Sequence, residues 1–177
     1  MNAHDDAVAR AAQVRLMIFD VDGVLTDGSL HFGPDGEVMK TFNVLDGHGM
    51  KLLQAAGVVT AIISARKSPI VLRRAADLGI AHVMQGIHNK KEAFEELLRT
   101  TQVAPEHCGF VGDDVIDLPI LTRVGFAASV PNGHSEVRSR VQYVTQAGGG
   151  RGAARELCDF ILRAQGAYDA VIASYLS

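Results

Sequence analysis

The sequence has few cysteines and no long run of one charge or of apolar residues. Only Cys108 and Cys158 are present, too few for a disulfide scaffold. The net charge is -3 without a run of Lys or Arg, so we expect neither nucleic acid nor a membrane as a partner. Apolar stretches such as 58–63 are too short to span a bilayer. Residues 1–14 contain early acids and no apolar block, so we expect no signal peptide and, by default, a cytoplasmic location.

The composition that remains is that of a globular protein with a sizeable core. Hydrophobic residues make up 47% and charged residues 21% of the 177 residues, which is typical of one soluble domain. We find no internal repeat, low-complexity tract or linker. The sequence therefore predicts a single domain over residues 1–177, with a C-terminal tail from about 166 to 177.

Short apolar runs alternate with helical patterns. The apolar runs are 16–19, 58–63, 81–84, 110–111 and 126–127. Helices are predicted at 49–56, 68–79, 89–100 and 152–165. The best-marked helix starts at Ser68-Pro69 and stops at Gly79. This alternation predicts an α/β fold, a Rossmann-like three-layer sandwich with a central parallel sheet.

One segment departs from this alternation. Residues 29–42 read as a β-hairpin around the turn 33–36, inserted after the first strand. Its apolar side chains, which we expect to be exposed and to need cover, are Leu30, Phe32, Val38 and Phe42.

Polar residues follow the first two predicted strands, where ligands bind in open α/β sheets. Asp20 and Asp22 follow the first strand and would repel each other unless a cation or a proton separated them. Read alone, this pair is as compatible with a solvated acidic loop as with a site. Ser64 and Arg66 follow the second strand and suit an oxyanion, although a serine after a strand is more often a helix cap.

Two further groups come later in the chain. Lys90 begins a predicted helix and could reach a phosphate, although in isolation a solvated surface lysine is the better interpretation. Asp113, Asp114 and Asp117 follow the strand at 110–111. Three carboxylates so close together at a strand end are typical of a site for a hard divalent cation.

Taken together and in this order, the four groups resemble the motifs of the haloacid dehalogenase superfamily of phosphatases: Asp-x-Asp, Ser/Thr, Lys and an acidic cluster. The resemblance covers residues from about 16 to 165. The chain more closely resembles the small cap-less branch, whose members hydrolyse 3-deoxy-manno-octulosonate 8-phosphate for lipopolysaccharide synthesis. This closer likeness lies in 20–28, the hairpin, 42–44, 85–86, 112–114 and 148–153. The resemblance implies a Mg²⁺-dependent phosphatase acting on a small-molecule sugar-acid phosphate.

The resemblance also implies roles. Asp20 attacks phosphorus and becomes an aspartyl phosphate, and Asp22 protonates the leaving oxygen and later deprotonates water. Ser64 and Lys90 hold the transferring phosphoryl oxygens. The Mg²⁺ ligands are the Asp20 carboxylate, the Asp22 main-chain carbonyl and Asp113.

Other residues are assigned less directly by the same resemblance. Asp114 holds either Lys90 or a metal-bound water, and Asp117 is a weaker candidate for such a supporting role. Arg66 binds the sugar carboxylate or is an ordinary surface arginine. Lys90 rather than Lys91 falls at the family's lysine position. Leu45 stands where the family leads us to expect arginine, which leaves open a different sugar acid.

The intervals between Asp20 and Ser64 and between Ser64 and Lys90 are too short to hold a cap domain. The site therefore needs cover from elsewhere, and the resemblance implies a homotetramer with the hairpins at its centre. The glycine-rich segment 148–152 is flexible by composition and serves as a mobile anion-binding tail or as a loop into the last helix.

Three alternatives remain: a phosphatase for a nine-carbon sugar acid 9-phosphate, a receiver-like signalling domain and a non-catalytic phosphatase-like domain. In receivers the acidic pair precedes the phosphorylated aspartate. Here the Asp-x-Asp comes first and the acidic cluster comes late.

Overall fold

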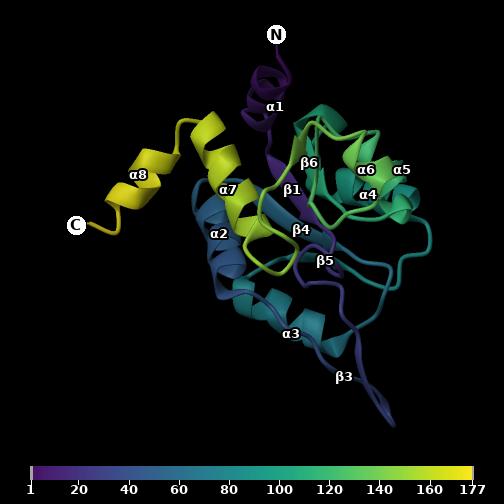
Figure 1. Ribbon diagram of the computed structural model, residues 1–177. Helices are drawn as coiled ribbons and strands as arrows, with labels where there is room; N and C mark the ends of the chain where they lie inside the picture. The colour runs from purple at the N-terminus through teal and green to yellow at the C-terminus, as the bar shows by residue number, and fades with distance from the viewer. Residues whose placement is uncertain (1, 177) are drawn as a thin grey trace.

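A parallel sheet of six strands lies at the centre of the structure, a computed structural model that describes residues 2–176 (Figure 1). The spatial order is β5-β4-β1-β6-β7-β8, and every neighbouring pair is parallel. The strands are β1 (Leu16–Phe19), β4 (Val59–Ile63), β5 (His82–Met84), β6 (Cys108–Val111), β7 (Phe126–Ser129) and β8 (Tyr143–Val144). The central strand, β1, is buried along its whole length, which explains its uninterrupted apolar sequence.

Helices cover both faces of this sheet. One face carries α1 (Ala3–Ala11), α2 (Val44–Ala55), α3 (Pro69–Leu78) and α7 (Ala153–Ala164), and the other carries α4 (Lys90–Thr101), α5 (Leu118–Leu121) and α6 (Ser135–Arg138) (Figure 1). The side chains of β1 alternate between the two cores: Met17 and Phe19 point into the first, and Leu16 and Ile18 into the second. The predicted three-layer sandwich is confirmed. Within residues 2–176, no helix combines the length and apolarity needed to cross a membrane.

Local capping signals explain where the helices begin and end. As predicted, α3 starts after Ser68, whose hydroxyl accepts a hydrogen bond from the Val71 amide at 3.3 Å, and it ends at Gly79, which is left-handed. By contrast, α2 begins at Val44, earlier than predicted. The side chain of Asn43 caps it by accepting from the Leu45 amide at 2.8 Å.

The chain contains elements that the sequence patterns did not predict. At the N-terminus, α1 is capped by Asn2, and near the other end the predicted tail contains the short helix α8 (Tyr168–Ala173). The final strand, β8, is only two residues long, too short for a period to be recognised. Two 3₁₀ helices occupy Pro105–His107 and Val115–Asp117.

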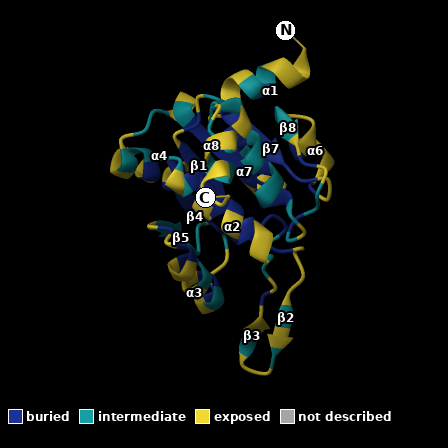
Figure 2. Cartoon of the chain, turned by 90° about the vertical axis from the view of Figure 1, so that its left-hand side faces the viewer, coloured by how far each residue is buried: buried dark blue, intermediate teal, exposed yellow. Residues whose placement is uncertain are grey.

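The hairpin projects from the body of the molecule. It consists of β2 (His31–Gly33) and β3 (Gly36–Met39), which pair only with each other, and much of its surface is exposed (Figure 2). Phe32 and Val38 are 59% and 61% exposed. Phe42, which we expected to be exposed, is instead half-buried and packs against the first core, because it lies beyond the hairpin where the chain returns to the sheet.

The glycine-rich segment 148–152 is held in place rather than free. The Gly149 amide donates to Asn132 Oδ1 at 2.8 Å, and Asn132 Nδ2 donates in turn to the Gly23 carbonyl at 3.1 Å. The Gly150 amide donates to the Val24 carbonyl at 2.9 Å. Of the two interpretations, the loop leading into α7 is the one the structure supports, and this loop backs the segment that follows β1.

We expect Gly149→Ala to lower the free energy of unfolding by about 1–3 kcal/mol, because overpacking forces backbone shifts. A Cβ at this position would lie 1.9 Å from the Gly23 carbonyl oxygen. Gly148→Ala is the matched control, since its Cβ would meet no atom closer than 3.5 Å. Urea unfolding of both variants measures the difference, and equal stability of the two would contradict the close approach described here.

Candidate active site

The carboxyl ends of three neighbouring strands form an open cleft. Asp20 follows β1, Ser64 follows β4 and Asp113 comes shortly after β6, and β1 lies between the other two strands. After β1 the chain forms strands first on one side of β1 and then on the other. In such sheets, ligands bind at the carboxyl ends of the strands, at the point where the strand order changes direction. The cleft has a volume of about 240 Å³ and is lined by Asp20, Asp22, Gly28, Ser64, Ala65, Arg66, Asp113, Asp114 and Ile116.

Lys90 joins two carboxylates at the bottom of this site. It is the first residue of α4, which Asn89 caps, and only 3% of it is exposed. Its ammonium donates to Asp20 Oδ1 at 2.9 Å and also to Asp117 Oδ1. Burial alone would lower the pKa of Lys90, but the charges of Asp20 and Asp117 outweigh it and raise the pKa. Lys91 instead faces outward and pairs with Glu95.

Asp117 organises the acidic cluster from within the protein. It is fully buried, and its Oδ2 accepts from the amides of Asp113 at 3.0 Å and Asp114 at 3.2 Å. Asp114 is exposed, and its carboxylate accepts from the Val115 amide. Of the two contacts expected for Asp114, the one to Lys90 is therefore made by Asp117, because the 3₁₀ turn at Val115–Asp117 brings the third acid back into the protein.

The carboxylates fit a divalent cation. One oxygen from each of Asp20, Asp113 and Asp117 lies within 4.8 Å of the others. Burial, followed by the charge of Asp117, raises the pKa of Asp20 to about 7, although Lys90 opposes the shift. Burial and the charges of Asp117 and Asp114 also raise the pKa of Asp113 to about 7. Three carboxylates against one ammonium leave negative charge uncompensated, and hard cations take such oxygen ligands.

Gly23 permits this arrangement at its closest point. A Cβ at this position would lie 2.0 Å from Asp113 Oδ2, and the residue has a positive φ of 88°. The glycine after Asp22 therefore lets the loop after β1 and the loop after β6 approach each other.

Asp22 has a partner that the sequence patterns did not reveal. Lys40 follows β3, and its ammonium binds Asp22 Oδ1 and lies 3.0 Å from Glu37 Oε1. Burial alone would lower the pKa of Lys40, but the hydrogen bonds and charges of Asp22 and Glu37 outweigh it and raise the pKa. In the sequence Lys40 is a lysine near the end of the predicted hairpin, and no spacing connects it to Asp22.

Ser64 and Arg66 occupy different depths of the cleft. Ser64 is 3% exposed, and its hydroxyl oxygen accepts from the Arg66 amide at 3.3 Å. Arg66 is exposed, and its guanidinium lies 5.6 Å from the centre of the Phe32 ring of the hairpin. The structure thus brings Asp20, Ser64 and Lys90 together and places Arg66 at the mouth.

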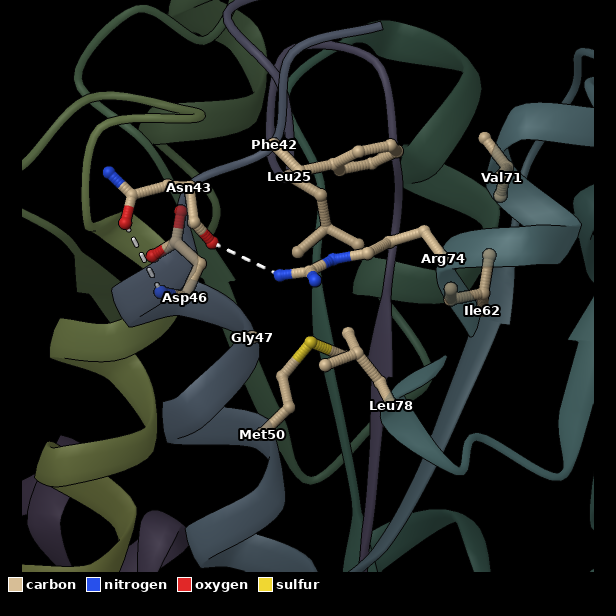
Figure 3. A pocket seen from close by; sticks show the side chains of 10 residues that line it. All are labelled: Leu25, Phe42, Asn43, Asp46, Gly47, Met50, Ile62, Val71, Arg74 and Leu78. Atoms are coloured by element: carbon tan, nitrogen blue, oxygen red, sulfur yellow. Dashed lines mark hydrogen bonds between the residues drawn. The ribbon is translucent and has the colours of Figure 1, made fainter. Parts of the chain in front are cut away.

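A second cavity lies between α2 and α3, beneath the root of the hairpin (Figure 3). Arg74 reaches across it, 5.8 Å from the Phe42 ring, and donates to the Asn43 carbonyl at 3.4 Å. The remaining volume is about 10 Å³, so there is room for at most one water molecule. Side chains of α2 and α3 nearly fill this second cavity, so it is too small to hold a substrate.

Leu45, which departs from the expected arginine, does not line the cleft. It lines a separate groove together with Tyr143, Gly152, Arg155, Glu156, Asp159, Phe160 and Arg163. Within one chain, the side chain at position 45 therefore does not face Asp20 and Ser64, whichever residue stands there.

Comparisons with known proteins agree with this geometry. The haloacid dehalogenase-like hydrolase family matches residues 75–157. The 3-deoxy-D-manno-octulosonate 8-phosphate phosphatase of Escherichia coli K12 is 46% identical over 164 residues, which cover 93% of this chain and 87% of that protein.

Solved structures are also similar to the chain. A probable YrbI family phosphatase from Pseudomonas syringae is 49% identical, with a TM-score of 0.95 and 98% of each chain covered. The 3-deoxy-D-manno-octulosonate 8-phosphate phosphatase of Moraxella catarrhalis, solved with magnesium, phosphate and 3-deoxy-D-manno-octulosonate (KDO), is 40% identical. Its TM-score is 0.94, and the match covers 97% of this chain and 98% of that one. These likenesses exclude the receiver interpretation, and the chain belongs to the 3-deoxy-D-manno-octulosonate 8-phosphate phosphatase family of haloacid dehalogenase-like hydrolases.

Proposed function

We propose that this chain hydrolyses KDO 8-phosphate to KDO and inorganic phosphate, with Mg²⁺ as cofactor, in the synthesis of lipopolysaccharide precursors. The observation that carries the proposal is the pairing of Asp20 with Lys90 at the carboxyl end of β1, in a cleft that also contains Asp22 and Ser64. The identity to the Escherichia coli and Moraxella catarrhalis enzymes supports the same substrate. Residues 1–177 act as one catalytic domain in this proposal.

Asp20 is the nucleophile in the proposed mechanism. Lys90 engages its Oδ1, so Oδ2 is the oxygen available to attack phosphorus and form an aspartyl phosphate. Lys90 and the Ser64 hydroxyl stabilise the negative charge on the transferring phosphoryl group. Asp20, Asp113 and the Asp22 carbonyl would hold the metal, with Asp117 beside them. When bound, magnesium offsets the repulsion between a carboxylate and a phosphate dianion.

Asp22 moves the protons of both steps. It lines the cleft two residues after the nucleophile and is partly exposed, so it can meet the leaving oxygen. It gives a proton to the sugar oxygen as the phosphorus–oxygen bond breaks, and it takes a proton from the water that hydrolyses the aspartyl phosphate. Arg66, at the mouth, binds the carboxylate of the sugar acid through its guanidinium.

The cover over the cleft comes from other copies of the chain. We propose a homotetramer with the hairpins packed together at its centre, because an isolated hairpin is marginal in water and this one exposes Leu30, Phe32, Val38 and Met39. Symmetric homo-oligomers are the common way to bury such a surface. The two unpaired cysteines, both buried, are compatible with the proposed cytoplasmic location.

We expect wild-type protein with Mg²⁺ to release phosphate from KDO 8-phosphate faster than from a nine-carbon sugar acid 9-phosphate. Faster release of phosphate from the 9-phosphate would identify the nine-carbon sugar acid 9-phosphate as the substrate instead.

Asp20→Asn removes the attacking charge, so we expect turnover to fall by several orders of magnitude while the fold is retained. Asp5→Asn, an exposed aspartate in α1, is the matched control. Phosphate release and circular dichroism are the measurements. Near-normal turnover of Asp20→Asn would rule out the covalent mechanism.

The raised pKa values of Asp20 and Asp113 make stability depend on pH and metal. Since their pKa values rise from 3.8 in the unfolded chain to about 7, their contribution is complete below pH 3.8 and is lost as the pH rises through 7. We therefore expect the Tm measured in excess chelator to be lower at pH 8 than at pH 5. Mg²⁺ should raise the Tm more at pH 8 than at pH 5, because its ligands are then deprotonated.

Thermal unfolding with and without Mg²⁺ measures this dependence. Asp113→Asn should lose most of the Mg²⁺-induced rise at pH 8, whereas Asp169→Asn, an exposed aspartate of α8, should retain it. A Mg²⁺ effect that is equal at both pH values and unchanged in Asp113→Asn would place the metal elsewhere.

The assembly proposal is tested by charging the hairpin. We expect Phe32→Asp combined with Val38→Asp to dissociate the tetramer, because two carboxylates would be buried at the interface. Activity on KDO 8-phosphate should fall far more than activity on p-nitrophenyl phosphate, since the neighbouring chain selects the substrate and does not transfer the phosphoryl group. Sedimentation and the two assays measure this, and a monomeric wild type with full selectivity would refute the proposal.

A further inference from the structure

The carboxylate of Asp22 is fixed by a lysine that belongs to the hairpin and not to the sheet. The side chain of Lys40 is 1% exposed and that of Asp22 is 19% exposed. Lys40 engages Oδ1 of Asp22, so Oδ2 is the oxygen left to meet a ligand in the cleft that Asp22 lines. Lys40 itself is not among the residues that line the cleft.

Lys40 is in turn anchored on its other side. Its ammonium lies 3.0 Å from Glu37 Oε1, and Glu37 Oε2 accepts a hydrogen bond from the Ser68 hydroxyl. The Ser68 amide donates to Gln85 Oε1 at 2.6 Å, and Gln85 Nε2 donates back to the Ser68 carbonyl at 3.2 Å. A continuous polar network therefore runs from Asp22 through the hairpin to the start of α3 and to the segment after β5.

We propose that Lys40 is a positioning residue that holds the carboxylate of Asp22 aimed at the leaving-group oxygen, with Glu37 anchoring Lys40. This inference rests on the proposed phosphatase function and assigns the hairpin a part in catalysis as well as in assembly. Without Lys40, the Asp22 side chain would be free to rotate about its own bonds in a loop. With Lys40, one oxygen is tied down and the other faces the cleft, which is the kind of orientation that general acid catalysis requires.

The proton balance shows which reaction depends on this orientation. As Asp20 bonds to phosphorus, the bond from phosphorus to the sugar oxygen breaks, and that oxygen takes the proton of Asp22. In the second step, water loses a proton to Asp22 as its oxygen bonds to phosphorus and the bond to Asp20 breaks. Lys40 gives and takes no proton. A sugar alkoxide needs the proton in order to leave, whereas p-nitrophenolate leaves as an anion.

The competing explanation is that Lys40 only neutralises Glu37 and fastens the hairpin to the body. That structural role would act through the hairpin's part in the proposed assembly, so any selective loss from it would be accompanied by changed sedimentation, whereas a lost orientation of Asp22 leaves sedimentation unchanged. Sedimentation and kcat/KM together separate the two explanations, since kcat/KM reports on the steps through formation of the aspartyl phosphate and so on protonation of the leaving group.

The experiment compares kcat/KM for KDO 8-phosphate and for p-nitrophenyl phosphate in Lys40→Met, Lys40→Arg and wild type. We expect Lys40→Met to lose about 100-fold or more on the sugar phosphate, the usual scale of general acid catalysis, and less than about fivefold on the aryl ester. Lys40→Arg should recover most of the loss, because it restores the cation. Lys91→Met, which removes an exposed lysine paired with Glu95, is the matched control and should resemble wild type.

Glu37→Gln provides a second test that keeps Lys40 in place, in case Lys40→Met does not fold. It should show the same selective loss at a smaller scale, about 10-fold on the sugar phosphate, with unchanged sedimentation. Equal losses on both esters in folded Lys40→Met or Glu37→Gln, or a selective loss that comes with changed sedimentation, would overturn the inference while leaving the proposed function intact. A wild type that cleaves neither ester with Mg²⁺ would refute the proposed function and this inference together.

Discussion

The interaction on which the site depends is the contact of Lys90 with Asp20 and Asp117. All three residues are almost completely buried, and buried charges are costly unless they are paired and hydrogen-bonded. The contact therefore fixes the relative positions of the end of β1, the start of α4 and the turn after β6. It also leaves the cluster with more negative charge than positive, which is why the site suits a divalent cation. Removing Lys90 would leave two carboxylates without compensation, so structure and chemistry cannot be separated at this residue.

Around this centre, two supports hold the catalytic loop after β1 from opposite sides. The glycine-rich loop packs against its backbone at Gly23 and Val24, and the start of the following helix is tied to α2, since the Asp46 carboxylate accepts from the Arg155 amide at 2.9 Å. On the other side, Lys40 brings the base of the hairpin to Asp22. The glycine-rich loop is held rather than free because it lies directly against the backbone of the loop after β1, where a Cβ at Gly149 would lie 1.9 Å from the Gly23 carbonyl oxygen.

The hairpin thus has two surfaces with different chemistry. Lys40 is buried and Glu37 is partly buried, and they form an ion pair, whereas Phe32 and Val38 are exposed. A chain without a cap domain has an open cleft, and here one projecting element carries both the ion pair that reaches Asp22 and an exposed apolar surface. Arg66 at the mouth lies 5.6 Å from the centre of the Phe32 ring, so the mouth of the cleft is also in contact with this element.

The sequence by itself determined the fold class, the ends of α3 and the placement of Asp20, Ser64 and Asp113 at strand ends, because strand periodicity, capping residues and polar groups after apolar runs are local properties. Read in isolation, Lys90 was better interpreted as a surface lysine, and the structure buries it. Only the tertiary structure decided that Asp117 rather than Asp114 contacts Lys90, that Lys40 holds Asp22, and that Phe42 is packed while Leu45 lies outside the cleft. These outcomes depend on how a short turn and a hairpin approach residues that are distant in the chain. Such contacts are set by the packing of whole elements against the sheet, and no spacing along the sequence records them.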